Sequence, residues 1–337
     1  MVKEPSYIQL QMNVRMGGTN NYLIMKTFPD FNEPGFDINA YNRRFIQSNV
    51  VINAISKNAS YDEHWGPLSI KSTIRGNEYY HVNNNKYAVT ANNYLIINDG
   101  NYYSTVIDSE TDVESFTINF SASFMKEALA LFHEKDESLL QNFDNSSSTY
   151  KLEFIEQLYL HDDIVSPIIQ ELYRLSQETI FDNQKIEEFY FILIDRLLIK
   201  RKRVLGEINK VNKVKESTKL ELYKRLNKAK DYIDSFFMED ITLKDLSQIC
   251  LLNQAYLLRQ FKNYFNQTPR QYIIKKRMEK ARLILEVDSS IPISEACLQV
   301  GYNDPSSFSK LFKHFFRLSP EKFQQKISNT IPTNSLR

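Results

Sequence analysis

The spacing of apolar residues divides the chain into a region with a period of two and a longer region with a helical period. Between Asn49 and Asn119, short runs rich in β-branched and aromatic residues are separated by turn formers, as at residues 83–85 and 98–100, a pattern typical of β-strands. Several short strands at this spacing predict a small barrel or sandwich. From Ser123 onward the apolar residues recur at helical spacing. The first forty residues show no clear period, and we expect an arm or an irregular lead-in.

The middle of the chain predicts two helices between Ile164 and Arg203. Pro167 suits a first helical turn. The apolar positions that share a face are Ile168, Leu172 and Leu175 in the first helix and Phe189, Ile192, Leu193 and Leu197 in the second. Such stripes need a partner, which is either a second copy of the chain or the barrel itself. Polar stretches at 142–150 and 206–218 are expected to be linkers.

Capping residues in the last third of the chain mark a series of helices joined by short turns. Side chains that accept hydrogen bonds from a first helical turn, prolines in that turn and a glycine at a helix end all recur there. The expected signals are Thr242 with Asp245 as a capping box, Asn253, Pro269, Gly301, and Asp304 before Pro305. A short helix, a tight turn and a second helix are therefore expected twice, which is the helix-turn-helix arrangement.

A fourteen-residue pattern occurs in both of these units. "RQFKNYFNQTPRQY" at 259–272 and "KLFKHFFRLSPEKF" at 310–323 align without a gap at an offset of 51 residues. The apolar residues expected to pack inward are Leu257, Phe261 and Phe265 in the first copy and Phe308, Phe312 and Phe316 in the second. A stripe of this kind is a core feature and not a ligand site in most proteins. The second helix of such a unit enters the DNA major groove.

The outward faces of the two repeats carry residues that suit base edges and phosphates. Arg, Lys and Ser donate to bases or phosphates, whereas Ala and Leu can contact a thymine methyl group. The predicted DNA contacts are Gln254, Ala255, Leu258, Arg259 and Lys262 in the first copy and Pro305, Ser306, Ser309, Lys310 and Lys313 in the second. A linking helix of roughly 18 residues would be about 27 Å long. That length predicts two recognition helices in successive major grooves, about 34 Å apart.

Charge supports a polyanionic partner for the C-terminal part alone. The net charge of the chain is +1. Residues 1–199 hold 15 Lys and Arg against 27 Asp and Glu, whereas residues 200–327 hold 26 against 14. A basic third in a nearly neutral protein indicates nucleic acid binding there, although a solvated basic surface explains the charge equally well.

The segment "RMEKARLILEVDSSIPISEACLQVGYNDPSSFSKLFKHFFRLSP" resembles the signature region of the AraC/XylS family of bacterial transcription regulators, and the resemblance extends from Tyr223 to Lys326. The resemblance implies double-stranded DNA as a partner, and regulation of transcription, usually activation through RNA polymerase. The family's base-facing positions carry over to Ala255, Leu258 and Arg259 in the first unit and to Pro305, Ser306, Ser309 and Lys310 in the second. Leu251, Asn266 and Arg317 stand where the family usually has glycine at turns.

The strand-rich segment "RGNEYYHVNNNKYAVTANNYLIINDGNYYS" resembles the cupin-like barrel that many members of this family carry as a sensor. Aromatic walls with a few polar groups suit a small-molecule effector. The candidate effector-binding residues are Trp65, Tyr79, Tyr80, Tyr94, Tyr102 and Tyr103. Core and sheet-face packing would require the same residue types, so both interpretations stay open. A possible homodimer depends in the same way on the helical stripes of residues 164–203.

Two further functions compete with a regulator. A metal-dependent cupin enzyme would need clustered ligands, but His64, His81, His133 and His161 are scattered, so we expect no enzyme, no metal and no cofactor. A non-specific structural DNA binder is hard to reconcile with an acidic half that would repel DNA. Cys250 and Cys297 sit in apolar helical patterns and are expected to be reduced thiols. No apolar run long enough for a membrane span and no secretory pattern occur, so no membrane partner and a cytoplasmic location are expected.

The sequence as a whole predicts an α+β protein. We expect a cupin-like regulatory domain at 1–130 and a helical linker with possible dimerisation at 131–217. A DNA-binding domain is expected at 218–327, with helix-turn-helix units at about 242–265 and 292–316.

Overall fold

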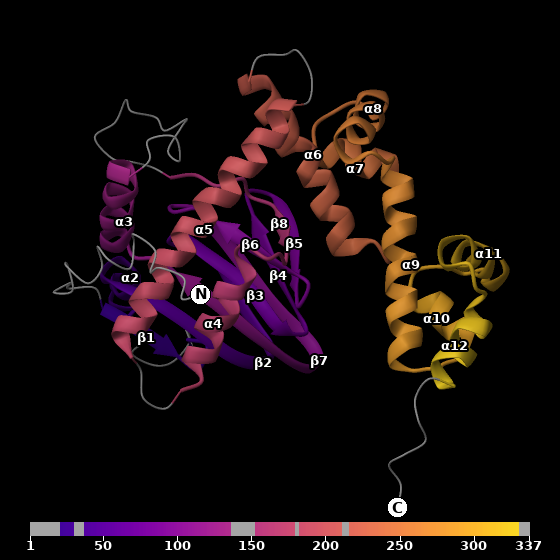
Figure 1. Cartoon of the computed structure of the whole chain (residues 1–337), viewed down its shortest axis with the longest axis horizontal. Coiled ribbons are helices and arrows are strands. Elements are labelled where there is room, and N and C mark those ends of the chain that lie inside the picture. Colours follow the sequence, from indigo (N-terminus) through magenta and orange to yellow (C-terminus); the bar gives the residue numbers. More distant parts are fainter. Residues whose placement is uncertain (1–20, 30–36, 136–151, 179–181, 211–215, 330–337) are drawn as a thin grey trace, which may run out of the picture. The chain divides into compact units, whose positions relative to one another are not determined.

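The computed structural model describes residues 21–29, 37–135, 152–178, 182–210 and 216–329. The chain forms two compact units, Met1–Leu220 and Glu221–Arg337 (Figure 1). The first unit combines a sheet with helices and the second is helical in its described residues, which confirms the predicted α+β class.

The N-terminal unit is built on a bent, eight-stranded sheet with the strand order β1-β2-β7-β3-β6-β8, in which β4 pairs with β7 and β5. Its strands are β1 Asn21–Met25, β2 Ser48–Trp65, β3 Ser69–Arg75, β4 Asn77–Val82, β5 Asn85–Thr90, β6 Asn93–Ile97, β7 Tyr102–Asn119 and β8 Leu158–Leu160. The long strands β2 and β7 pair along most of their length, with two register shifts. The first half of β7 also pairs with β4 and its second half with β3. The two long strands therefore connect the two ends of a barrel-like sheet.

One face of this sheet is covered by α3 Ala122–Lys135, α4 Ser166–Ser176 and α5 Asn183–Lys210, in a core that includes Val51 of β2. Helix α2 Ile38–Gln47 packs on the other face, because Phe45 shares a core with Val50 and Ile52, which alternate with Val51. Figure 1 shows α4 and α5 lying across the sheet. Leu172 of α4 and Tyr190 and Leu197 of α5 are buried in one core with Phe116 and Ile118 of β7. The predicted apolar stripes are thus covered inside this unit, and their need for a partner is met by the sheet.

Three expectations for the N-terminal unit were wrong. Part of the predicted irregular lead-in is strand β1, which pairs in parallel with β2, and α2 begins at Ile38 behind the cap Asp37. A five-residue strand has too few positions to show a period, and its partner is distant in sequence. Strand β8 interrupts the stretch predicted as helical and pairs with β6. The predicted linker at 206–218 was too long at both ends, since α5 continues to Lys210 and α6 begins at Glu216, and residues 211–215 lie outside the described residues. The other predicted linker, 142–150, lies outside the described residues.

The C-terminal unit contains two helix-turn-helix groups and one long helix between them. Its helices are α6 Glu216–Phe236, α7 Leu243–Ile249, α8 Gln254–Phe265, α9 Pro269–Val287, α10 Ile293–Gln299, α11 Pro305–Phe316 and α12 Pro320–Ser328. The two groups are α7 with α8 and α10 with α11, and the long helix α9 connects them. One core gathers α6, α7 and α8 around Phe261, and a second gathers α9, α10 and α11 around Phe308 and Phe312. The apolar residues of the two repeats that were predicted to pack inward lie in or against these two cores.

Candidate nucleic-acid interface and ligand site

The first helix-turn-helix is formed by α7 and α8 and is fixed by local caps. Thr242 and Asp245 form a complete capping box: the Thr242 hydroxyl accepts from the Asp245 N–H at 3.2 Å, and the Asp245 carboxylate accepts from the Thr242 N–H at 2.9 Å. Asn253 then caps α8 by accepting from the Tyr256 N–H at 2.8 Å. These bonds satisfy donors that the first turn of a helix leaves free. Both predicted caps are confirmed, and they determine where the recognition helix α8 begins.

The second helix-turn-helix, α10 and α11, repeats this design with different residues. Asp304 caps α11 by accepting from the Ser306 and Ser307 N–H groups at 3.0 and 3.1 Å, as predicted. Gly301 ends the preceding helix with a φ of 80°, and a Cβ at this position would lie 2.2 Å from the carbonyl oxygen of Met238. Glycine is required here both by the backbone conformation and by the close approach of another segment.

Three positions that resemble family glycines adopt the left-handed conformation without being glycine. Leu251 in the first turn has a φ of 53°, and Asn266 and Arg317 at the ends of α8 and α11 have φ values of 57° and 62°. Asparagine tolerates this region, whereas leucine and arginine are disfavoured there by their Cβ atoms. The turns keep the geometry of the motif although the sequence departs from it.

The predicted DNA-contact residues lie on the outer faces of α8 and α11. Nine of them are exposed and Ser309 is half-buried, while Leu257, Phe261, Phe308 and Phe312 on the opposite faces are fully buried. The Arg259 guanidinium lies over the ring of Tyr256 at 5.3 Å from its centroid. An exposed arginine supported in this way keeps its donors available to a ligand. No described contact tests these residues against DNA, so they stay predictions.

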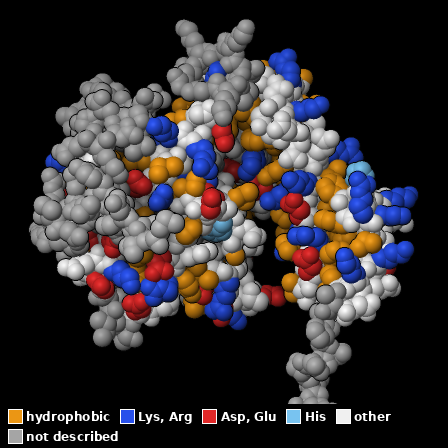
Figure 2. All heavy atoms as spheres, in the orientation of Figure 1, with side chains coloured by type: hydrophobic (Ala, Val, Ile, Leu, Met, Phe, Trp, Pro, Cys, Tyr) orange, Lys and Arg blue, Asp and Glu red, His pale blue; other side chains and the backbone are white. Residues whose placement is uncertain are grey.

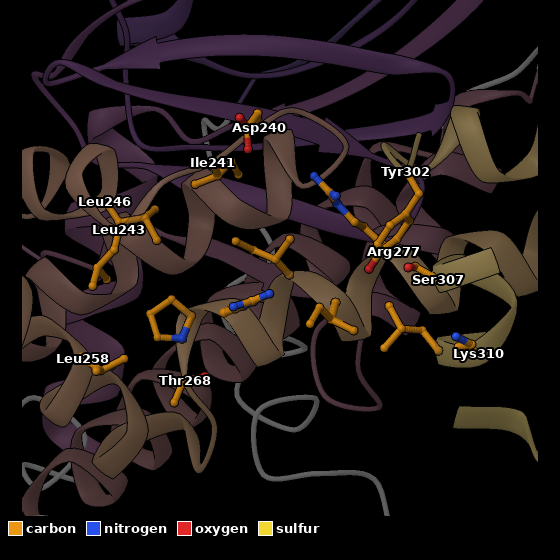
Figure 3. Close-up of a pocket in the computed structure, with 15 residues that line it drawn as sticks. Asp240, Ile241, Leu243, Leu246, Leu258, Thr268, Arg277, Tyr302, Ser307 and Lys310 are labelled. Atoms are coloured by element: carbon orange, nitrogen blue, oxygen red, sulfur yellow. The ribbon is translucent and has the colours of Figure 1, made fainter. Parts of the chain in front are cut away.

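A cleft of about 910 Å³ separates the two helix-turn-helix groups within this unit. Figure 3 shows Leu243, Leu246 and Leu258 at one end of it and Ser307 and Lys310 at the other. Two of the predicted DNA contacts, Leu258 and Lys310, therefore border the same cleft. Space of this kind between two recognition helices is needed if the DNA backbone passes between them.

Arg277 of α9 crosses this cleft and ties the two groups together. Its guanidinium donates to three carbonyl oxygens: Phe237 at 2.6 Å, Glu239 at 2.7 Å and Gly301 at 2.8 Å. The first two belong to the segment before α7, and the third belongs to the turn before α11. One rigid, forked side chain thus holds both turns. Sequence reasoning missed this residue, because a charged position on a long helix is usually exposed to solvent.

A buried ionic cluster fixes α9 to α6. Asp234 is nearly inaccessible and accepts from Lys230 at 2.7 Å, from the Tyr272 hydroxyl at 2.8 Å and from Lys276 at 2.9 Å. Burial alone would raise the pKa of Asp234, but the charges and hydrogen bonds of the two lysines hold it below its usual value. The carboxylate is ionised at neutral pH, and it anchors the base of the long helix.

Basic residues are spread over the exposed surface of the C-terminal unit. Figure 2 shows Lys and Arg side chains over the face of this unit that is in view, with apolar side chains between them. Residues 221–327 of this unit hold 18 Lys and Arg against 12 Asp and Glu, which is half of the excess found in residues 200–327. A basic surface attracts phosphates, which provide most of the affinity and little of the specificity in DNA binding.

The N-terminal unit holds a small cavity of about 50 Å³ inside the sheet. It is lined by Phe28, Pro29, Tyr41, Ile52, Tyr61, His64, Lys71, Glu78, Tyr80, Tyr103, Thr105 and Thr117. Two of the predicted effector residues, Tyr80 and Tyr103, lie here. Lys71 and Glu78, both almost fully buried, were missed, because nothing in the alternation of β3 and β4 shows which face closes on a cavity.

The other predicted effector residues lie elsewhere. Tyr94 is buried in the core under the helices and stacks on Tyr159, with ring centroids 5.4 Å apart. Trp65 is half-buried beside the core around Val50 and Ile52. Tyr79 is half-buried on β4, and Tyr102 is exposed. None of these four lines the cavity, so the six aromatic residues do not form one group.

The histidines named from the sequence are not brought together into a metal site. His64 is on β2, His81 is on β4 and His161 follows β8, and the His133 side chain lies outside the described set. Among the residues that the structure describes, no group of three His, Cys, Asp or Glu is placed to hold a metal ion.

Two family models match the chain in the units just described. An AraC-like ligand binding domain matches residues 50–193, and a helix-turn-helix domain matches residues 246–326. The chain belongs to the AraC family of transcriptional regulators. This family is not one of enzymes. The AraC-like ligand binding domain includes most of the residues that line the cavity, and the helix-turn-helix match includes α8, Arg277 and α11.

Several curated regulatory proteins are similar in sequence. The Msm operon regulatory protein of Streptococcus mutans is 27% identical over 193 residues, which are 57% of this chain and 66% of that protein. The lactose operon transcription activator of Staphylococcus xylosus is 31% identical over 100 residues, covering 30% of this chain and 36% of that protein. The chain therefore spans less than two thirds of the length of these relatives. A crystal structure of ToxT from Vibrio cholerae, 12% identical, covers 82% of this chain and 99% of its own, with a TM-score of 0.32.

Among the described residues, no helix is both long enough and apolar enough to cross a membrane.

Proposed function

We propose that this chain is a sequence-specific, DNA-binding regulator of transcription. The observation that carries this proposal is the pair of recognition helices, α8 and α11, in one compact unit. Each helix buries its aromatic face, and nine of the ten residues predicted to contact DNA are exposed on the opposite faces. Arg277 joins the two helix-turn-helix groups, so they can present a fixed spacing to successive major grooves.

The experiment that tests this proposal is a footprint of the full chain on a site selected from genomic fragments. Two protected segments about 10 base pairs apart on one face of the duplex are expected. The affinity for the selected site should exceed that for a scrambled duplex of the same length by at least about a thousandfold at physiological salt. Equal affinity for both duplexes would favour the non-specific structural binder over a regulator.

The N-terminal unit acts in this proposal as the sensor of a small-molecule effector. Its match to an AraC-like ligand binding domain and its partly polar cavity support this role. A ligand there can change DNA binding only if its affinity differs between two arrangements of the protein. An effector that changes operator affinity 5- to 150-fold corresponds to about 1–3 kcal/mol of coupling.

Activation through RNA polymerase and work in the cytoplasm, where the chromosome lies, are parts of the same proposal. The S. xylosus relative is named a transcription activator. A reporter gene placed behind the selected site should rise in expression when the chain is produced.

The homodimer predicted from the helical stripes loses that support, because α4 and α5 bury their apolar residues within their own unit. Sedimentation of the full chain measures its oligomeric state directly.

A further inference from the structure

Three strands place a reactive set of side chains on the inner face of the barrel-like sheet. Lys71 is on β3, Glu78 on β4 and Tyr103 on β7, and their exposed fractions are 4%, 2% and 6%. A lysine and a glutamate are rarely buried to this degree unless they are paired or functional. Both line the cavity, together with the rings of Tyr80 and Tyr103.

Lys71 and Glu78 each contact a hydroxyl group of the cavity lining. The Lys71 Nζ donates to the Tyr103 hydroxyl at 2.8 Å and lies 4.6 Å from the centroid of that ring. Glu78 accepts from the Thr105 hydroxyl through Oε1 at 2.8 Å, and the Tyr80 hydroxyl is a second polar neighbour of the same buried carboxylate. Burial of a lysine and a glutamate in the lining of one cavity is costly unless the two groups are paired or functional.

Burial lowers the pKa of Lys71 to about 7, even though the charge of Glu78 acts to raise it. An ordinary lysine titrates near about 10.4, so Lys71 holds far more of the neutral, nucleophilic amine at neutral pH. The titratable groups around it are Glu78 and Tyr80 on β4, Tyr103 on β7, His64 and Tyr61 on β2, and Tyr41 on α2. The pKa of His64 is itself lowered, mainly by burial, so this imidazole is largely neutral at pH 7. Glu78 is the group whose negative charge acts against the lowering of the Lys71 pKa.

We propose that Lys71 binds a small aldehyde or ketone as a reversible imine, with Tyr103 and Glu78 as the proton-transfer groups. This inference rests on the proposed sensor role of the N-terminal unit and names the class of its effector. The cavity of about 50 Å³ restricts the ligand to a few heavy atoms, because a single water needs roughly 10–15 Å³ of such space. A carboxylate ligand would meet the charge of Glu78, so an uncharged carbonyl compound fits better.

The chemistry needs no oxidant, reductant or other co-reactant. The neutral Lys71 amine adds to the carbonyl carbon, and the carbonyl oxygen takes a proton from the Tyr103 hydroxyl to give a carbinolamine. Glu78 accepts one proton from the nitrogen and then gives it to the carbinolamine hydroxyl, which leaves as water. The carbon–nitrogen double bond forms as the Tyr103 phenolate takes the second proton from the nitrogen, so both groups end as they began. Hydrolysis of the imine follows the same steps in reverse. One amine and one carbonyl compound thus give one imine and one water.

Reductive trapping tests this proposal on the full-length protein. Acetaldehyde at limiting concentration is added at pH 7 with sodium cyanoborohydride, which converts an imine into a stable ethylamine, and peptide mass mapping gives the rate at each lysine. Lys71 should be ethylated at least about tenfold faster than Lys86, an exposed lysine on the neighbouring strand β5. Tyr103→Phe should slow Lys71 at least about tenfold and leave Lys86 unchanged.

The controls separate this inference from the proposed function. Lys71→Met should remove the fast site, and Lys86→Met should not affect it. An unmodified Lys71 in a wild-type sample whose Lys86 has reacted would overturn the inference, whether or not any variant folds. DNA binding of the untreated protein is measured on the same preparation. Intact DNA binding with an inert Lys71 refutes only the imine, whereas a reactive Lys71 without DNA binding refutes only the regulator.

Discussion

Leu251 adopts a backbone conformation that is unfavourable for a leucine side chain. Its φ of 53° lies in the left-handed region, and its side chain is 75% exposed, so it gains little from packing. Gly301 holds the corresponding turn of the second unit with a φ of 80°, and a Cβ there would lie 2.2 Å from the carbonyl oxygen of Met238. The same backbone turn is thus made once by the residue suited to it and once by one that strains it.

Replacing Leu251 by glycine should stabilise the C-terminal unit by about 1 kcal/mol, because the strain of a left-handed leucine is removed. Urea unfolding followed through the helical signal of the 216–337 fragment measures the change. Gly301→Ala is the matched control and should destabilise the same fragment by about 2 kcal/mol or more. A loss of stability in both variants would show that the Leu251 side chain contributes packing that its exposure hides.

Arg259 and Lys262 should differ in what they recognise. Arg259 lies one turn after Ala255 on the exposed face of α8, and its guanidinium rests over Tyr256. Arg259→Ala should cost about 1–3 kcal/mol at the selected site and relax base preference at one position. Lys262→Ala should weaken all duplexes alike and reduce the salt slope by about one. Fluorescence anisotropy measures the affinity of each variant for the selected and the scrambled duplex. Lys86→Ala in the N-terminal unit is the control. Equal losses on the two duplexes for both variants would mean that the face is misassigned.

Residue-scale signals predicted the caps well and the cavity poorly, for a physical reason. A cap depends on side chains within three residues, so Thr242, Asn253 and Asp304 could be named from the sequence alone. Lys71 and Tyr103 meet across strands that are 32 residues apart. Nothing local in β3 distinguishes a lysine that closes a cavity from one that faces solvent.

The long helix α9 is the element that sets the geometry of DNA binding. It is one residue longer than the roughly 18 residues expected from the sequence, and it begins at a second capping box formed by Thr268 and Gln271. Arg277 sits near its middle and holds the turns on both sides. Helix bounds follow from periodicity and caps, whereas β1 and β8 are stabilised by distant partners that periodicity does not show.

Arg277→Met should separate the two helix-turn-helix groups without removing either one. The variant leaves three carbonyl oxygens without their charged donor, and a single such bond is worth about 1.5–3 kcal/mol. Affinity for the selected site should fall at least tenfold, while affinity for scrambled DNA changes little, because phosphate contacts do not require a fixed spacing. Arg282→Met on the same helix is the control, because Arg282 is exposed, pairs with Glu286 at 3.7 Å and lies over the Phe316 ring, with no described hydrogen bond to either turn that Arg277 holds. An unchanged footprint in the Arg277 variant would contradict this role.

Asp234 should make the C-terminal unit sensitive to acid. Its pKa in the folded protein is below the ordinary value, so protonation favours the unfolded state. Its contribution is present above about pH 4 and is lost as the pH falls further. Asp234→Asn should cost about 2–3 kcal/mol at pH 7, since two lysines lose a buried partner, and should flatten the dependence of stability on pH below 4. Urea midpoints between pH 3 and pH 7 measure both effects, and a parallel pH profile in the variant would contradict the assignment.

At the scale of the whole molecule, the chain joins an acidic unit that contains a cavity to a basic unit that contains two recognition helices. The split of charge between residues 1–199 and 200–327 was visible in the sequence, and so was the change from strand to helix. The burial of α4 and α5 against the sheet was not, because an apolar stripe looks the same whether it meets a sheet or a second copy. The distribution of charge and periodicity along the sequence thus predicted the two kinds of unit. The structure was needed to show which apolar faces are buried within each unit.

The C-terminal unit should bind DNA without the N-terminal unit, because both recognition helices, α9 and Arg277 lie within it. We expect a fragment of residues 216–337 to fold, with its own two cores, and to bind the selected site with an affinity that falls steeply with salt. In cells, this fragment should occupy the site but lose any response to the effector, since the cavity with Lys71 is removed. Anisotropy across a salt series and a reporter gene, each compared with the full chain, provide the measurements. A folded fragment without salt-dependent binding would exclude the DNA-binding assignment, and a reporter response identical to that of the full chain would exclude the sensor.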